Sequence, residues 1–227
     1  MKKEIEQCLI VTGGCVDLQL LDAVYHGAYG YMAHPFTIGV DKGLEALEEL
    51  HIEPNIAIGD FDSANDGIRA KYVTGPDALL HSSVIKLDRR KDYTDTHAAI
   101  LEALRYKPKQ LLIMGATGTR LDHSLANMSL LGVCLEAGVN AQILDVHNRI
   151  SLIKDTHVLR KKHLFGPYIS FFPYGDYARM TLKGFEYDVT DLRICQGDSI
   201  SISNEMREEE GHITVGDGYL YVMETKD

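Results

Sequence analysis

The first 146 residues alternate short apolar runs with longer segments whose apolar residues recur at helical spacing. The apolar runs predict strands at residues 8–12, 36–40, 56–58, 84–87, 110–114 and 142–146. The helical spacing predicts helices at 43–51 and 94–106, and a third that carries a leucine stripe from Leu121 and ends at Gly138. This alternation predicts an α/β fold, with a mostly parallel sheet flanked by helices on both faces.

After Asn148 the pattern changes to short apolar runs separated by turn residues, at 150–153, 168–172, 179–182, 199–203, 213–215 and 219–223. Several short strands at this spacing, with no helical stripe among them, predict an antiparallel all-β sandwich or barrel. We therefore expect two domains: an α/β domain over residues 1–148 and an all-β sandwich domain over residues 149–227.

Charge and cysteine content limit the class of protein. A net charge of -10 argues against a broad nucleic-acid surface, which needs clustered positive charge, but it leaves room for a nucleotide. The apolar run from Cys8 to Val11 is too short for a signal peptide or a membrane span, so we expect no membrane association. The four cysteines are scattered without C-x-x-C spacing, which indicates reduced thiols and a cytoplasmic location.

The most informative segment is 59–63, Gly-Asp-Phe-Asp-Ser, which directly follows the predicted strand at 56–58. A strand that enters a short acidic loop places carboxylates at the carboxyl edge of a sheet, where open α/β folds build their sites. Asp60 and Asp62 repel each other unless a cation or a proton intervenes, and such oxygen ligands suit Mg²⁺. The alternative is an acidic surface loop.

A second acidic segment, Lys-Asp-Tyr-Thr-Asp at 91–95, follows the predicted strand at 84–87 and opens a helix at Thr94. Asp92 and Thr94 have a structural alternative, because both residue types cap helices by accepting hydrogen bonds from free backbone amides. If the two strands are neighbours, the carboxylates of Asp92 and Asp95 converge with those of the first segment. Such a cluster is unstable without a divalent cation, so a metal is implied.

A third segment, Gly-Ala-Thr-Gly-Thr-Arg-Leu-Asp-His at 115–123, follows the predicted strand at 110–114 and leads into a helix. Small residues such as Thr117 and Gly118 let backbone amides approach a phosphate, whose charge a helix N-terminus favours. Arg120 can grip phosphate oxygens with its planar guanidinium, and Asp122 can orient Arg120 or His123. The alternative is a tight turn with a surface salt bridge and Asp122 as a helix cap.

Two other strand ends carry weaker candidates. The sequence Thr12-Gly13-Gly14 either admits a phosphate or sugar beside the backbone or is merely a tight turn. Asp41 again follows an apolar strand, and a helix cap is its competing role. The chain lacks the P-loop sequence G-x-x-x-x-G-K-[S/T] and any protein-kinase signature, so neither of these enzyme classes is expected.

Taken together and in this order, the three segments resemble the thiamine pyrophosphokinase family. The order and spacing match across residues 10 to 127, with further similarity at 39–43, 145–150 and 201–205. The resemblance implies an α/β domain joined to a β-sandwich, in a homodimer with active sites between subunits. It also implies transfer of the terminal diphosphate of ATP to the hydroxyethyl oxygen of thiamine, with release of AMP and a requirement for Mg²⁺.

The resemblance further implies roles for individual residues. The metal-binding aspartates fall on Asp60, Asp62 and Asp95, and the catalytic set adds Asp92 and Arg120. The ATP contacts, including the glycine-rich turns and strand ends described above, are expected at Gly13, Gly14, Asp41, Ser63, Lys91, Thr94, Thr117, Gly118, Arg120, Asp122 and His123.

Thiamine contacts in the second domain match Ser203 and Asn204. The chain contains no tryptophan, whereas some members of the family stack thiamine against one; Met206 or another residue takes that place. An extra basic pair, Arg89-Arg90, either reaches phosphate or is solvated.

Two other classes compete with this interpretation. A haloacid-dehalogenase-type phosphatase also uses Asp-x-Asp after a strand, with Asp60 as the nucleophile, but that motif usually follows the first strand. A non-catalytic nucleotide sensor would bind Mg-ATP without turnover.

Overall fold

The computed structural model describes residues 4–62, 64–74, 83–88, 90 and 92–227. Its chain divides into two compact units, Met1–Val146 and His147–Asp227, and the division falls two residues before the expected boundary. Among the described residues no helix has the length and apolar character needed to cross a bilayer.

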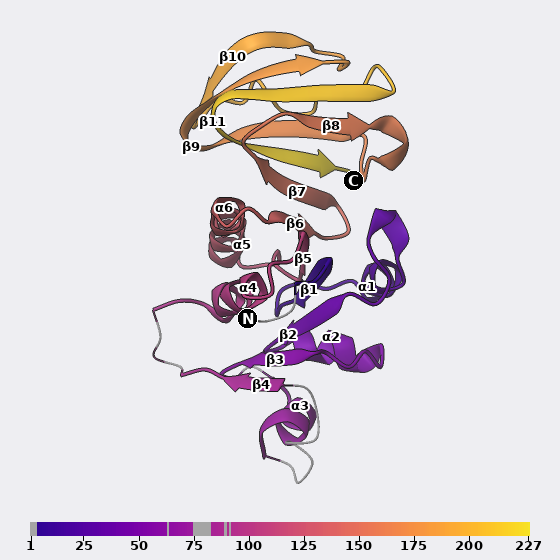
Figure 1. The fold of residues 1–227 in the computed structure, drawn as a ribbon, viewed down its shortest axis with the longest axis vertical. Helices are drawn as coiled ribbons and strands as arrows, with labels where there is room; N and C mark the ends of the chain where they lie inside the picture. Colours follow the sequence, from indigo (N-terminus) through magenta and orange to yellow (C-terminus); the bar gives the residue numbers. More distant parts are fainter. Residues whose placement is uncertain (1–3, 63, 75–82, 89, 91) are drawn as a thin grey trace. The chain divides into compact units, whose positions relative to one another are not determined.

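The first unit contains one fully parallel sheet (Figure 1), which confirms the predicted α/β architecture. Its strand order is β6-β5-β1-β2-β3-β4. The strands are β1 (Gln7–Val11), β2 (Phe36–Val40), β3 (Ile56–Gly59), β4 (Ser83–Lys86), β5 (Gln110–Met114) and β6 (Asn140–Leu144). Every residue of the central strand β1 is buried, as expected for a strand covered on both faces.

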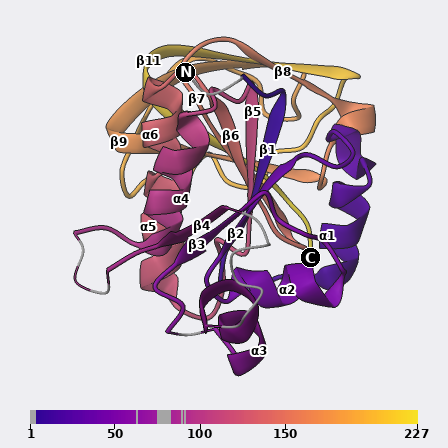
Figure 2. The same ribbon diagram turned by 60° about the horizontal axis from the view of Figure 1, so that its bottom comes forward.

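Helices lie on both faces of this sheet: α4, α5 and α6 on one side, α1 and α2 on the other (Figures 1 and 2). The helical segments are α1 (Leu18–Tyr25), η1 (Ala28–Gly30), α2 (Gly43–Glu49), α3 (Asp66–Arg69), η2 (Ala70–Thr74), α4 (Asp95–Leu104), α5 (Leu121–Ser129) and α6 (Leu131–Glu136). The predicted helix from Leu121 to Gly138 is divided into α5 and α6, which meet at Leu130. The helices α1 and α3 were not predicted.

The direction in which strands are added reverses at β1. The chain runs outward from β1 through β2 and β3 to β4, and then returns to the other side of β1 for β5 and β6. The connections that leave β1 and β5 therefore diverge at the carboxyl edge of the sheet. In open α/β sheets a ligand crevice forms at such a reversal.

The second unit is antiparallel, as predicted, with the order β10-β9-β11-β7 and with β8 paired to β11. Its elements are β7 (Asn148–Ile153), β8 (His157–Arg160), the 3-10 turn η3 (Lys161–His163), β9 (Tyr168–Lys183), β10 (Val189–Cys195) and β11 (Glu210–Thr225). One end of β11 pairs with β8 and the other end with β7, so a single long β9–β11 ribbon supports both halves of the unit.

The predicted strands of this unit need three corrections. Four short strands are in fact two long ones, β9 and β11, because Gly175 and Gly218 adopt positive φ inside them and the chain bends without leaving the ladder. The predicted strand at 199–203 is a turn, in which Ser201 Oγ donates to Phe171 O at 2.6 Å and Ile200 is exposed. The strands β8 and β10 were missed.

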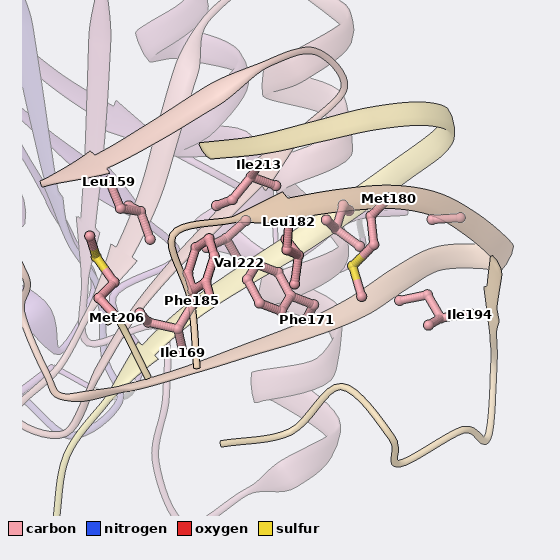
Figure 3. Close-up of a cluster of buried hydrophobic side chains, with 12 residues drawn as sticks. Leu159, Ile169, Phe171, Met180, Leu182, Phe185, Ile194, Met206, Ile213 and Val222 are labelled. Carbon is pink, nitrogen blue, oxygen red and sulfur yellow. The ribbon is translucent and has the colours of Figure 1, made fainter. Parts of the chain in front are cut away.

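The core of the second unit is a cluster of apolar side chains that converge from β8, β9, β10 and β11 (Figure 3). Phe171 and Phe185 lie at its centre with their rings edge to face, 5.8 Å apart, and neither is exposed. This burial stabilises the ribbon without any helix, because both halves of the ribbon contribute to the same cluster.

Candidate active site

A cavity of about 470 Å³ opens at the carboxyl edge of the parallel sheet. Four segments line it: residues 12–15 after β1, 40–42 at the end of β2, 94–96 at the start of α4, and 115–120 after β5. His123, Ser124 and Asn127 of α5 complete the wall. The cavity thus lies at the strand-order reversal, where the fold itself predicts a ligand.

Glycines bring two of these loops into direct contact. Gly14 N donates to Gly115 O and Cys15 N to Thr117 O, both at 2.8 Å. A Cβ on Gly14 would lie 2.3 Å from the carbonyl oxygens of Gly115 and Thr117, so no other residue fits there without moving the backbone. The two glycine turns predicted from the sequence therefore form one backbone-lined wall.

Two side chains hold the loop after β5 in place. Thr117 Oγ1 donates to Asp145 Oδ2 at 2.7 Å, which ties the loop to the end of β6. Asn127, buried on α5, donates from Nδ2 to Ala116 O at 2.8 Å. Thr117 and Gly118 line the cavity, and Asp145 and Asn127 position the loop that carries them. Their contact with ATP stays a prediction.

Three carboxylates gather beside this wall. Asp41 follows β2, Asp60 follows β3, and Asp95 begins α4; one oxygen of each lies within 4.8 Å of the others. Like charges at this distance repel unless a cation or a proton intervenes, and carboxylate oxygens are the ligands that Mg²⁺ prefers. These residues fit a divalent cation.

The second aspartate of the Asp-x-Asp segment lies outside this group. Asp62 is exposed, and its backbone N–H donates to Asp60 Oδ1 at 3.1 Å. Phe61 between them is buried, with a φ of 59°. The segment therefore turns sharply at Phe61, and Asp41 supplies the third carboxylate of the group. Asp62 as a metal ligand stays a prediction.

The segment at 91–95 combines capping with the cavity wall. Thr94 is the N-cap of α4, with Oγ1 accepting from His97 N at 3.2 Å, and it also lines the cavity. The capping alternative is therefore correct for Thr94, while Asp95 joins the carboxylate group. Asp92 is exposed and does not belong to the cavity wall. Ser63 and Lys91, two expected ATP contacts, lie outside the described residues, as does Arg89.

Arg120 and Asp122 form a two-pronged ion pair on the surface. The Nε–Oδ1 distance is 3.2 Å and the Nη2–Oδ2 distance is 2.6 Å. The hydrogen bonds from Arg120 lower the pKa of the Asp122 carboxyl below its usual value. Arg120 and His123 line the cavity, whereas Asp122 orients the guanidinium from outside it. The structure shows the predicted salt bridge, and the role of Asp122 in orienting Arg120 toward phosphate stays a prediction.

Sequence reasoning missed several residues of the wall. Lys42 and Cys15 each adjoin a residue that was identified, so their positions in the sequence were a usable signal. Thr96 and Asn127 carried no such signal, because a polar residue on a helix is ordinarily solvated. Lys42 is exposed, follows Asp41 directly and lines the cavity, which adds a basic residue to the wall.

The expected thiamine contacts differ in their surroundings. Asn204 is buried, and its amide is used inside the unit: Oδ1 accepts from Tyr187 N at 3.1 Å, and Nδ2 donates to Tyr187 O at 3.0 Å. Ser203 is exposed, has a φ of 56°, and donates its backbone N–H to Ser170 Oγ at 3.0 Å. Both contacts with thiamine stay predictions.

These features define the chain as a two-unit protein, in which a parallel α/β unit with a polar, carboxylate-bearing cavity precedes an antiparallel β unit. Comparison with known proteins makes the class specific. Residues 31–143 match the family model described as "Thiamin pyrophosphokinase, catalytic domain", and residues 156–220 match "Thiamin pyrophosphokinase, vitamin B1 binding domain".

Individual relatives agree with these models. The chain is 33% identical over 195 residues to thiamine pyrophosphokinase of Bacillus subtilis (strain 168), covering 86% of this chain and 89% of that protein. The crystal structure of the B. subtilis protein superposes with a TM-score of 0.83 at 29% identity, over 98% of this chain and 100% of that one. For thiamin pyrophosphokinase from Geobacillus thermodenitrificans the TM-score is 0.80 at 28% identity, over 97% and 98%. The chain belongs to the thiamin pyrophosphokinase family, which confirms the resemblance noted in its motifs.

Proposed function

We propose that this protein transfers the diphosphate of ATP to the hydroxyethyl oxygen of thiamine, giving thiamine diphosphate and AMP. The observation that carries the proposal is the pair of family matches, one for a catalytic domain and one for a vitamin B1 binding domain, in that order along one chain. The cavity of the first unit supports it, because it offers a backbone wall, carboxylates and cations together.

ATP is proposed to bind in this cavity, with its phosphates against the glycine wall at Gly13, Gly14 and Gly118. Gly14 N and Cys15 N already bind the loop after β5, so the amides of Gly13 and Gly118 are the ones proposed to meet anionic oxygens. Lys42 and Arg120 are the cations among the described residues of the wall, and we assign both to the phosphates. The Arg120 guanidinium is already bound to Asp122, so the side chain loses little conformational freedom when it binds phosphate.

Asp41, Asp60 and Asp95 would hold Mg²⁺, with Asp62 close enough along the chain to be proposed as a further ligand. A bound Mg²⁺ neutralises charge on the phosphate oxygens that the carboxylates alone would repel. Asp41, an expected ATP contact, would therefore interact with ATP through the bound Mg²⁺.

The transfer forms a bond between the hydroxyethyl oxygen and the β-phosphorus and breaks the bond from that phosphorus to the oxygen that leaves with AMP. The hydroxyl proton passes to a carboxylate, for which Asp92, exposed and three residues before Asp95, is the proposed acceptor. Phosphoryl-type transfers pass through loose transition states, so alignment and charge stabilisation by the cavity residues matter more than a strong base.

Thiamine is a cation, and the net charge of -10 attracts it. Ser203 and Asn204 remain the proposed contacts in the second unit. The Asn204 amide is hydrogen-bonded to the backbone of Tyr187, so we propose that Asn204 positions the 203–204 turn. We assign the direct contact with thiamine to the exposed Ser203.

The protein is proposed to act as a homodimer in the cytoplasm. The helix α5 buries Asn127 alone among its residues, while Leu121 and Leu125, one helical turn apart, are 74% and 64% exposed. A second copy of the chain would cover this apolar face. All four cysteines are free thiols, which fits a reducing compartment.

One turnover assay tests the proposed activity. The purified protein is incubated with Mg-ATP and thiamine, and the products are separated by chromatography. Equal amounts of AMP and thiamine diphosphate are expected. Release of inorganic phosphate with a covalent phosphoryl-aspartate at Asp60 would identify a phosphatase instead, and nucleotide binding without any product would identify a sensor.

A further inference from the structure

Two buried threonines meet at the base of the cavity. Thr12 directly follows the β1 strand and Thr96 lies in the first turn of α4; their hydroxyl oxygens are 2.7 Å apart. Only 5% of Thr12 and 7% of Thr96 is exposed, yet both residues line the cavity. The sequence had indicated Thr12 only as part of the segment Thr12-Gly13-Gly14, and it had not indicated Thr96.

The hydrogen bonds of this pair do not use all of its protons. Each threonine hydroxyl carries one proton and can also accept. In the contact between Thr12 and Thr96 one hydroxyl donates and the other accepts, so the proton of the accepting hydroxyl remains. Within the described part of the chain that hydroxyl has no other side-chain or backbone hydrogen bond. A buried donor of this kind requires an acceptor, because leaving it without one costs free energy.

The position of the pair determines the chemistry of that acceptor. Gly13 and Gly14 follow Thr12 directly, and Asp95 directly precedes Thr96, so the hydrogen bond joins the segment of the glycine wall to the segment that carries one of the three carboxylates. An anionic oxygen bound beside the glycine wall accepts such a proton strongly, because hydrogen bonds to charged oxygens are shorter and stronger than neutral ones.

We propose that the Thr12–Thr96 pair donates one hydrogen bond to a phosphate oxygen of the nucleotide in this cavity. The inference rests on the proposed use of ATP and deepens it by naming a donor for the phosphate chain. The hydrogen bond between Thr12 and Thr96, called the inner hydrogen bond below, also joins the end of β1 to the start of α4. It thereby fixes the position of the hydroxyl that donates to the phosphate.

Valine substitutions test the proposal, because valine keeps the shape of threonine and removes the hydroxyl. We expect the Thr12→Val/Thr96→Val double variant to weaken Mg-ATP binding at least about tenfold by titration calorimetry, as loss of a bond to a charged group implies. Its KM for thiamine should stay within about twofold of the wild-type value, since the lost bond contacts the other substrate. Thr37→Val is the control: Thr37 is also buried, with 1% exposed, and it donates to Pro35 O at 2.9 Å, but it does not line the cavity.

The single variants distinguish a hydrogen bond to phosphate from a purely structural role of the pair in the cavity wall. Each single variant loses the inner hydrogen bond completely but keeps one hydroxyl that can donate to the ligand. Donation therefore predicts that at least one single variant binds Mg-ATP more tightly than the double variant. Neither single variant should be more stable to heat than the double variant, because each keeps one buried hydroxyl without its partner. If each single variant loses as much affinity as the double variant, the pair only braces the wall and the proposal is wrong.

Adenosine, which has no phosphate, supplies the last comparison. The double variant should bind adenosine as the wild type does; an equal loss for adenosine would move the contact to the sugar or base and overturn the assignment. Unchanged Mg-ATP affinity in the double variant would refute the contact alone. A wild-type protein that binds no nucleotide would refute the proposed function, and the contact with it.

Discussion

Thr117 and Asp145 join the glycine-rich loop to the neighbouring strand end through a 2.7 Å hydrogen bond. The loop after β5 is thereby fixed at the point where it meets Gly14 and Cys15 of the loop after β1. The wall proposed to receive the phosphates is therefore rigid before any ligand arrives, which lowers the entropic cost of binding.

Removing this bond should loosen the phosphate wall without touching the carboxylates. Asp145→Ala is expected to raise the KM for ATP about tenfold and to lower the free energy of unfolding by about 1 kcal/mol, the typical value of one such bond. Asp145→Asn keeps an acceptor oxygen and should retain most of the activity. Steady-state kinetics and denaturant titrations measure both effects; equal KM values in Asp145→Ala and the wild type would show that the bond has no role in the site.

The carboxylate group should determine the requirement for metal. Asp41→Asn, Asp60→Asn and Asp95→Asn are each expected to lower turnover by about 100-fold or more and to raise the Mg²⁺ concentration needed for half-maximal rate, since a metal clamp contributes several kcal/mol. Asp66→Asn, an exposed acid in the first turn of α3, is the control and should behave as the wild type does.

The same Mg²⁺ titration decides the role of Asp62. If Asp62 is a metal ligand, Asp62→Asn should lose as much turnover as Asp60→Asn. Its circular dichroism spectrum should match that of the wild type, which shows that the fold is intact. Full activity in Asp62→Asn would remove this residue from the metal site and leave Asp41 as the third ligand.

The exposed apolar face of α5 should control self-association. Leu125→Glu is expected to convert the homodimer into a monomer, because it places a charge at the centre of a surface that a second copy would cover. Leu101→Glu, at a partly exposed position on α4, is the control. Light scattering after size-exclusion chromatography gives the mass directly; a wild-type protein that already runs as a monomer would contradict the proposed dimer.

His157 should make the second unit less stable in mild acid. Its pKa lies below the usual 6.5, mainly because burial disfavours the charged imidazole, and also because of the nearby Arg149 charge, while Glu224 opposes the shift. The unfolded chain binds a proton below about pH 6.5 and the folded unit resists it, so stability is complete above that pH and falls as pH decreases through this range. His157→Gln should flatten the fall in melting temperature between about pH 7 and 5. His212→Gln, at an exposed position, should not.

Local patterns predicted most of the first unit. The strands at 36–40 and 110–114 have the predicted bounds, because a parallel strand buried on both faces reads as a continuous apolar run between polar ends. The glycine turns at Gly14 and Gly115 could also be recognised, because few residue types allow two backbone segments to approach closely. In the second unit the predicted strand ends at Gly175 and Gly218 are wrong, because a turn residue there bends a strand instead of ending it.

The sequence by itself determined the α/β-then-β order, the glycine wall and the acidic strand ends, since each depends on residues that are neighbours in the chain. Only the tertiary structure decided which carboxylates meet, with Asp41 in the group and Asp62 outside it. It alone paired Thr12 with Thr96 and Thr117 with Asp145. Those contacts depend on strand order and on the direction of side chains at the sheet edge, and neither is encoded in any short stretch of the chain.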